Sequence, residues 1–153
     1  MRAKRPKDLS YAKWLAQYYL SFRMHSHAEL LIKLQKKEVP YPFIKEALDW
    51  CKEQGYINDL DFAKRYIKDA VNLKRRGEHR IIQELYAKKV NREMVEQAFS
   101  EVRAELDFDA ALSHAFEVKA KGLDLNQRKD RDKLIAHLAR KGFKIGDILK
   151  LIK

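Results

Sequence analysis

Apolar side chains recur at intervals of three or four residues along almost the whole chain. This spacing places them on one face of an α-helix, and we find no convincing alternation at every second residue of the kind that is typical of a β-strand. The first such segment carries Tyr11, Leu15, Tyr18 and Phe22, which we expect to share the core face of one helix. Prolines and glycines separate the segments. The pattern therefore predicts an all-α fold of nine short helices.

The apolar positions also repeat along the chain. A shift of 51 residues carries Phe22 onto Leu73 and Leu34 onto Leu85, and a further shift of 53 residues carries Leu85 onto Leu138. The agreement includes the short turn between the second and third helix of each group, which makes coincidence a poor explanation. We therefore predict three tandem three-helix repeats, which span residues 1–57, 58–105 and 106–153.

Each predicted repeat is too small to bury much surface alone, so neighbouring repeats should pack end to end. The product would be an elongated, curved array. The helix that follows Gly55 begins after only a few residues, which favours tight coupling of the first two repeats. We expect Gly77, Gly122 and Gly142 to end helices, because glycine accepts the backbone conformation that terminates them.

The net charge of the chain is +11. The excess of basic over acidic residues is five, two and four in the three predicted repeats, so it is not confined to a tail. A distributed positive charge favours an extended contact with a polyanion or an acidic partner. A well-solvated helical surface that happens to use more lysine than glutamate explains the charge equally well.

Several features of the sequence favour a cytoplasmic, non-membrane protein, which we expect to be a monomer. The single cysteine, Cys51, excludes an internal disulfide. The longest apolar runs are far too short to cross a bilayer, and the N-terminus lacks the uninterrupted apolar core of a secretory signal.

Catalysis is not expected. His25 and His27 are two residues apart, so on one helix they would point in different directions and could not easily share a metal ion. Cys51 lies on an apolar helix face, and no glycine-rich phosphate loop is present. We predict neither enzymatic activity nor a cofactor.

The order and spacing of several short motifs resemble those of a known family. The longest stretch is the run Gly55-Tyr56-Ile57-Asn58-Asp59, followed by Phe62-Ala63, Tyr66-Ile67, Gly77, Arg80-Ile81, Glu84-Leu85, Lys88 and Val90. This stretch resembles the middle repeat of the RecX regulatory proteins, which modulate the bacterial recombinase RecA. Further similarity lies around Glu29-Leu30 and around Arg140-Lys141-Gly142-Phe143. Two departures are Lys89, where the family often has glycine, and Asn58, where it has aspartate.

The resemblance implies a protein of tandem three-helix repeats without enzymatic chemistry. It implies binding to RecA and to the RecA–DNA filament, with suppression of filament extension, ATPase activity and co-protease activity. The implied DNA contact is independent of sequence and extends to single and double strands.

Clusters of basic residues are the candidate contacts with phosphates or with acidic side chains of a filament. Cations near a helix C-terminus also stabilise the helix dipole, so a purely structural role is the alternative for each cluster. The candidate residues are Lys74, Arg75, Arg76, Arg80, Lys88, Lys89, Arg92, Arg128, Lys129, Arg131, Lys133, Arg140, Lys141 and Lys144.

Aromatic side chains could instead stack on the bases of a single strand. Most of them, including Tyr18, Phe22 and Tyr66, fall on the predicted apolar faces, which favours core packing. Trp14 and Trp50 fit those faces less well and suggest contacts between repeats or an exposed patch for a protein partner.

Two other functions remain compatible with the sequence. Helix-turn-helix regulators, which bind specific DNA sequences, are also built from three-helix units with basic helices. A helical-repeat scaffold for some other acidic protein would have a similar composition. Discrimination between DNA sequences would favour the first alternative, and absence of both RecA and DNA binding would favour the second.

Overall fold

The computed structural model describes residues 5–152, and within this range the chain contains nine α-helices, one short 3₁₀ helix and no β-strand. The elements, in chain order, are α1 (Leu9–Leu20), α2 (His27–Lys36), α3 (Tyr41–Glu53), α4 (Asp59–Asn72), α5 (Glu78–Ala87), α6 (Arg92–Val102), η1 (Arg103–Glu105), α7 (Phe108–Ala120), α8 (Arg128–Arg140) and α9 (Ile145–Ile152).

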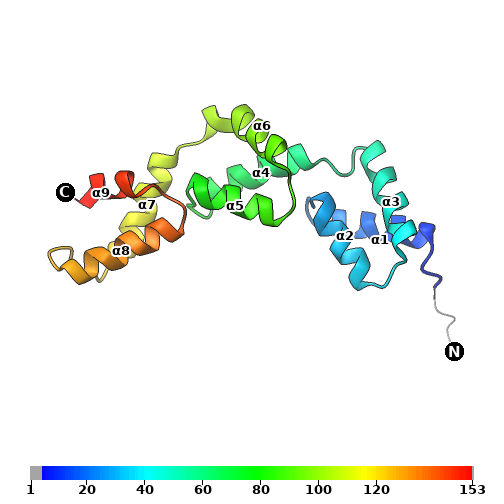
Figure 1. The fold of residues 1–153 in the computed structure, drawn as a ribbon, viewed down its shortest axis with the longest axis horizontal. Coiled ribbons are helices and arrows are strands. Elements are labelled where there is room, and N and C mark those ends of the chain that lie inside the picture. Colours follow the sequence, from blue (N-terminus) through cyan, green and yellow to red (C-terminus); the bar gives the residue numbers. More distant parts are fainter. Residues whose placement is uncertain (1–4, 153) are drawn as a thin grey trace.

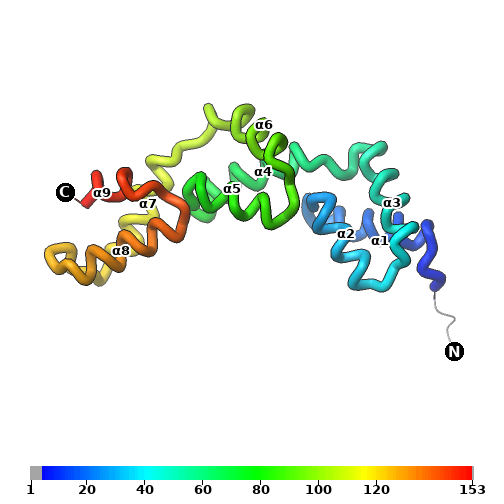
Figure 2. Tube along the Cα trace, viewed as in Figure 1, coloured from blue at the N-terminus to red at the C-terminus, as the bar shows by residue number. Residues whose placement is uncertain are grey.

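The helices form a row of three groups. Helices α1–α3 lie at one end, α4–α6 in the middle and α7–α9 at the other end, and the row follows a shallow arch (Figure 1). The chain passes along the row from group to group (Figure 2). The predicted all-α array of tandem three-helix repeats is therefore confirmed.

The first helix of each group begins with the same kind of cap. The side chains of Asp8, Asn58 and Asp107 each accept a hydrogen bond from the backbone N–H three residues further along, at 3.0, 3.1 and 2.9 Å. These bonds satisfy one of the N–H groups that a helix start leaves without a partner. Three short polar side chains at corresponding places thus fix where each group begins.

The turn between the second and third helix is also repeated. Glu38, Lys89 and Gly142 all have positive φ angles, of 60°, 62° and 99°. They are 51 and 53 residues apart, which matches the shifts that align the apolar positions. Lys89 adopts the left-handed conformation without being glycine, so this departure from the family pattern preserves the turn.

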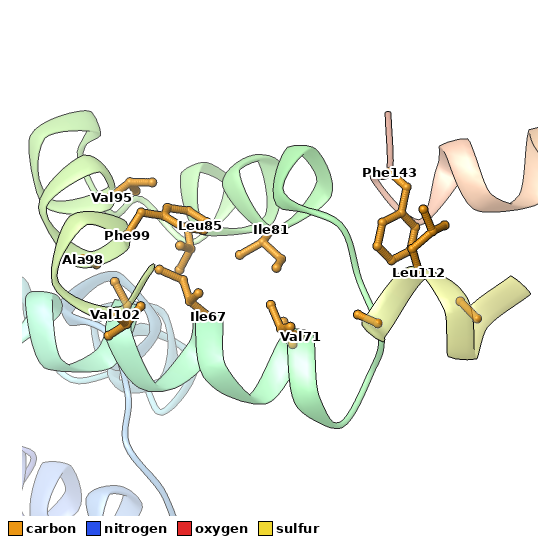
Figure 3. Packing of buried hydrophobic residues seen from close by; sticks show 14 of the residues in the cluster. Ile67, Val71, Ile81, Leu85, Val95, Ala98, Phe99, Val102, Leu112 and Phe143 are labelled. Atoms are coloured by element: carbon orange, nitrogen blue, oxygen red, sulfur yellow. The ribbon is translucent and has the colours of Figure 1, made fainter. Parts of the chain in front are cut away.

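The buried side chains form two separate cores. One core lies within the first group and includes Leu34, Ile44 and Leu48. The other runs without a break from α4 to α9. In Figure 3, Ile81 of α5 lies opposite Val71 of α4, and Leu85 of α5 lies opposite Ile67 of α4. The expected tight coupling of the first two repeats is therefore limited to polar contacts such as Lys88–Glu29, whereas a continuous apolar core joins the second and third.

Gly77 and Gly142 show why the second and third groups fit so closely. Gly77 lies at the N-terminus of α5, not at the end of α4, which finishes at Asn72. Its N–H donates a hydrogen bond of 2.7 Å to the carbonyl of Lys141. A Cβ atom added to Gly77 would lie 2.3 Å from the carbonyl carbon and oxygen of Gly142. The absence of a side chain at Gly77 therefore allows two backbone segments to touch.

The expected core face of α1 is partly wrong. Tyr18 and Phe22 are exposed, at 46% and 69%, and Phe22 lies beyond the end of the helix. The core is instead contacted by the small residues Ala12 and Ala16 together with Leu15. Close packing of α1 on α3 needs small side chains, and this leaves the larger rings on the outer surface.

Candidate partner-binding surface

The structure brings two of the predicted basic clusters together where the second and third groups meet. The Arg80 guanidinium donates to the carbonyl of Arg140 at 3.3 Å, and the Lys141 ammonium donates to the carbonyl of Lys74 at 3.1 Å. These contacts join the end of α4 and the start of α5 to the end of α8. We refer to this surface as the basic junction, which comprises Lys74, Arg75, Arg76, Arg80, Arg140 and Lys141.

Some cations of the basic junction hold the fold. Arg76 forms an ion pair with Glu84, which also lies 3.8 Å from Arg80, and all three side chains are partly buried. Burial lowers the pKa of the Lys141 ammonium, and the nearby charges of Arg76 and Arg80 lower it further. The Glu84 carboxylate, which lies close to both arginines, offsets part of the repulsion among these three cations.

The other cations of the basic junction are available to a partner. Lys74, Arg75 and Arg140 make no side-chain hydrogen bond or ion pair within residues 5–152, and Lys74 and Arg140 are exposed. Arg75 is held in a left-handed backbone conformation, with φ of 53°, in the turn between α4 and α5. These three side chains can contact a phosphate or a carboxylate without breaking a contact of the fold.

Lys88 has a structural role at the junction of the first and second groups. Its ammonium lies 3.4 Å from a carboxylate oxygen of Glu29, which Arg23 also contacts at 2.9 Å. Burial alone would raise the pKa of Glu29, but hydrogen bonds from Arg23 and from the Ser26 N–H, together with the charges of Lys88 and Arg23, lower it to about 2. Glu29 is therefore a fixed anion that ties the two groups together.

The remaining predicted cations do not join the basic junction. Arg92 is paired with Glu96 at 2.9 Å along α6, and both side chains line an open groove of about 1100 Å³ over α5 and α6. Lys89 and Lys144 are exposed beside the turns that follow α5 and α8.

The cations at the start of α8 lie far from its basic end. Arg131 donates to the carbonyl of Leu125 at 2.9 Å and so fixes the preceding loop. Arg128, Lys129 and Lys133 are exposed, and Arg128 lies 3.9 Å from Asp132. With a rise of ~1.5 Å per residue, this end of α8 is about 18 Å from Arg140.

A groove that the sequence did not predict lies between the first and second groups. Its volume is about 570 Å³, and we call it the Phe22 groove after its most exposed aromatic side chain. Its cationic and aromatic lining includes Phe22, Arg23, Arg65, Tyr66, Lys74 and Lys88.

Arg23 and Arg65 were not among the candidate residues. The shift of 51 residues that relates the first two repeats carries Arg23 onto Lys74. Because Lys74 was a candidate residue, the repeat could have identified Arg23 as its equivalent. Because Lys74 also belongs to the basic junction, the Phe22 groove and the basic junction share this residue.

The two side chains with catalytic potential, His25 and Cys51, are both buried within the fold. His25 is buried, and because lysine only donates hydrogen bonds, its Nε2 accepts from Lys33 at 2.8 Å while its Nδ1–H donates to the carbonyl of Arg23. Burial lowers the pKa of His25, and burial raises the pKa of the Cys51 thiol to about 11. Across residues 5–152 no group of three side chains could hold a metal ion, and no helix is long and apolar enough to cross a membrane.

The chain matches two family models. Residues 12–51 match the first three-helix domain of RecX, and residues 58–98 match the second. Together these segments cover more than half of the chain and lie within the first two groups of helices.

Several curated relatives carry the name regulatory protein RecX. The relative from Vibrio vulnificus is 37% identical over 129 residues, which is 84% of this chain and 82% of the relative. The relative from Vibrio parahaemolyticus is 33% identical over 148 residues, which is 97% of this chain and 94% of the relative. The relative from Bacillus pumilus is 30% identical over 88% of this chain, but the chain spans only about half of that relative's length.

Solved structures show the same fold. A crystal structure of a regulatory protein RecX superposes with a TM-score of 0.79 over 94% of this chain and 72% of the other. The crystal structure of RecX from Lactobacillus salivarius gives a TM-score of 0.75 over 95% of this chain and 96% of the other. Sequence identity is 22% in both cases, so these two similarities establish the fold alone.

Proposed function

Because the chain belongs to the RecX family, we propose that it binds the recombinase RecA and its DNA filament and inhibits filament extension, ATPase activity and co-protease activity. It acts in the cytoplasm as a monomer, without a cofactor and without catalytic chemistry of its own. The names of the relatives support a regulatory role, and the residues of this chain support the way in which it binds.

One observation carries the proposal. The basic junction presents Lys74, Arg75 and Arg140 from two successive repeats on one surface of an elongated body. Cations gathered from separate helices favour contact with an extended anionic surface, whereas a sequence-specific regulator would present one exposed helix to the major groove. An elongated body that lies along a filament would occupy space that DNA or a protein substrate needs.

Charge reversal tests this proposal. We expect the triple variant Lys74→Glu/Arg75→Glu/Arg140→Glu to bind RecA filaments on single-stranded DNA at least about tenfold more weakly, because three favourable charges become repulsive. Arg76 and Lys141 are left intact because they hold the fold. Binding is measured by co-sedimentation with purified RecA filaments, and helical content by circular dichroism.

A matched control carries the same change in net charge elsewhere. Lys36, Lys37 and Lys45 are exposed in the first repeat, and Lys36 lies in the last turn of its helix, as Arg140 does. The variant Lys36→Glu/Lys37→Glu/Lys45→Glu should lose less than about twofold in binding. Equal losses in both variants would show that net charge matters and that the basic junction is not the contact.

The two alternative functions give different results in the same assay. A helix-turn-helix regulator would bind DNA of a preferred sequence and would sediment equally well with DNA that lacks RecA. A scaffold for another acidic protein would sediment with neither. Either result would replace the proposed function.

A further inference from the structure

The outer surface of the first repeat carries a line of exposed aromatic side chains. Trp14 and Tyr18 are each 46% exposed and Phe22 is 69% exposed. The ring centroids of Trp14 and Tyr18 are 5.5 Å apart with nearly parallel planes, and those of Tyr18 and Phe22 are 5.0 Å apart and edge-on. Large aromatic side chains that pack against one another outside the core form an exposed apolar patch, and such a patch indicates a binding surface.

The spacing of the rings decides where a flat ligand could bind. Insertion of a base between two rings requires about 7 Å between their planes, twice the 3.4 Å stacking distance of bases. The rings of this line are closer than that, so no base fits between them. A base can stack only on an outer face, and Phe22, the last and most exposed ring, lines the Phe22 groove.

The charge of the Phe22 groove suits a phosphate chain. Arg23 and Lys88 share Glu29, and Arg65 is paired with Asp69 at 3.2 Å, which leaves more cations than anions around the groove. Lys74 has no acidic partner within the described residues and is exposed. A ring for stacking and cations for phosphates therefore lie at one site.

We propose that the Phe22 groove is a stacking site for an unpaired base of single-stranded DNA, with Phe22 as the platform and Lys74 and Arg65 as contacts to the neighbouring phosphates. This inference rests on the DNA contact of the proposed function and assigns a specific site to it. A duplex is excluded from the site, because its bases are paired and their faces are covered. An acidic protein segment would satisfy the cations but would leave the face of Phe22 without a matching planar group.

The test measures binding of the whole chain to labelled DNA by fluorescence anisotropy, with no RecA present. The probes are a 20-nucleotide oligo-dT and an abasic 20-mer that has the same phosphates but no bases. We expect the chain to prefer oligo-dT by about tenfold, since stacking on an aromatic side chain contributes on that order per base. Phe22→Ala should remove this preference, and Phe22→Trp should retain it.

Leu73 provides the matched control. It occupies the position equivalent to Phe22 in the second repeat, is 75% exposed and does not line the Phe22 groove. Leu73→Ala should leave the preference for oligo-dT unchanged. Because both side chains are largely exposed, neither variant should unfold the chain.

Two results would overturn the inference. One is equal affinity of the unmodified chain for oligo-dT and for the abasic strand. The other is a Phe22→Ala variant that keeps the preference but loses binding to RecA, which would assign Phe22 to a protein contact. A chain that does not bind RecA could still show the preference for oligo-dT, because this assay contains no RecA. The inference and the proposed function can therefore fail separately.

Discussion

Replacing Gly77 by alanine should lower the free energy of unfolding by about 3 kcal/mol, at the upper end of the usual cost of inserting a methyl group into a close-packed contact. The added Cβ would lie 2.3 Å from the carbonyl carbon and oxygen of Gly142 and 2.5 Å from the backbone nitrogen of Phe143. These are backbone atoms, which cannot rotate away as a flexible side chain could. The φ angle of Gly77 is −82°, so the cost arises from the contact and not from the conformation of Gly77 itself.

Separation of the two backbone segments would also break the hydrogen bond from the Gly77 N–H to Lys141. The measurement is urea denaturation followed by circular dichroism. Gly146→Ala is the matched control, because Gly146 lies inside α9 and a Cβ there would meet nothing within 4 Å. That substitution should be neutral or stabilising by up to about 1 kcal/mol. Equal stability of the Gly77→Ala variant and the unmodified chain would contradict the close approach of the two repeats.

Replacing Leu34 by alanine should unfold the first repeat selectively. Leu34 is fully buried in the core that α1–α3 form by themselves, and removal of a buried leucine typically costs about 3 kcal/mol. Because that core does not continue into α4–α9, the loss should stay within α1–α3. Hydrogen exchange measured by mass spectrometry should show faster exchange in α1–α3 and unchanged protection in α5 and α8.

Leu85 lies 51 residues beyond Leu34, at the equivalent position of the second repeat, and gives the opposite expectation. It belongs to the core that runs from α4 to α9, so Leu85→Ala should accelerate exchange in the second and third repeats together. A Leu34→Ala variant with equal loss of protection in all three repeats would contradict the separation of the two cores.

The periodicity of the sequence predicted the fold well because each repeat is defined by the local spacing of apolar residues along its helices. Most of the apolar positions that follow the shifts of 51 and 53 residues are buried in corresponding places, as Leu34, Leu85 and Leu138 illustrate, whereas Phe22 and its equivalent Leu73 are both exposed. The division at residues 57 and 105 stays a prediction, because the limits of a repeat depend on how the linking residues are assigned.

Two errors of the sequence analysis have one physical cause. The role of Gly77 depends on its contact with Gly142 in the next repeat, and the exposure of Phe22 depends on how closely α1 packs on α3. Helical periodicity describes one helix at a time and contains no information about such contacts. Neighbouring elements decide which apolar side chains are covered.

The same reason limits what the sequence predicted for the basic clusters. Arg76 and Lys88 each have an acidic partner, Glu84 and Glu29 respectively, whose position depends on the fold. Lys74 and Arg140 are far apart in sequence, and only the packing of the second and third repeats places them on one surface. Charge counts therefore located the clusters but did not separate the structural cations from the available ones.

The most direct test of the central claim is the rate of ATP hydrolysis by RecA on single-stranded DNA as this chain is added. We predict that the rate falls as the concentration of the chain rises, and that the Lys74→Glu/Arg75→Glu/Arg140→Glu variant requires at least about tenfold more protein for the same inhibition. An unchanged rate in the presence of excess unmodified chain would contradict the proposal that it inhibits RecA.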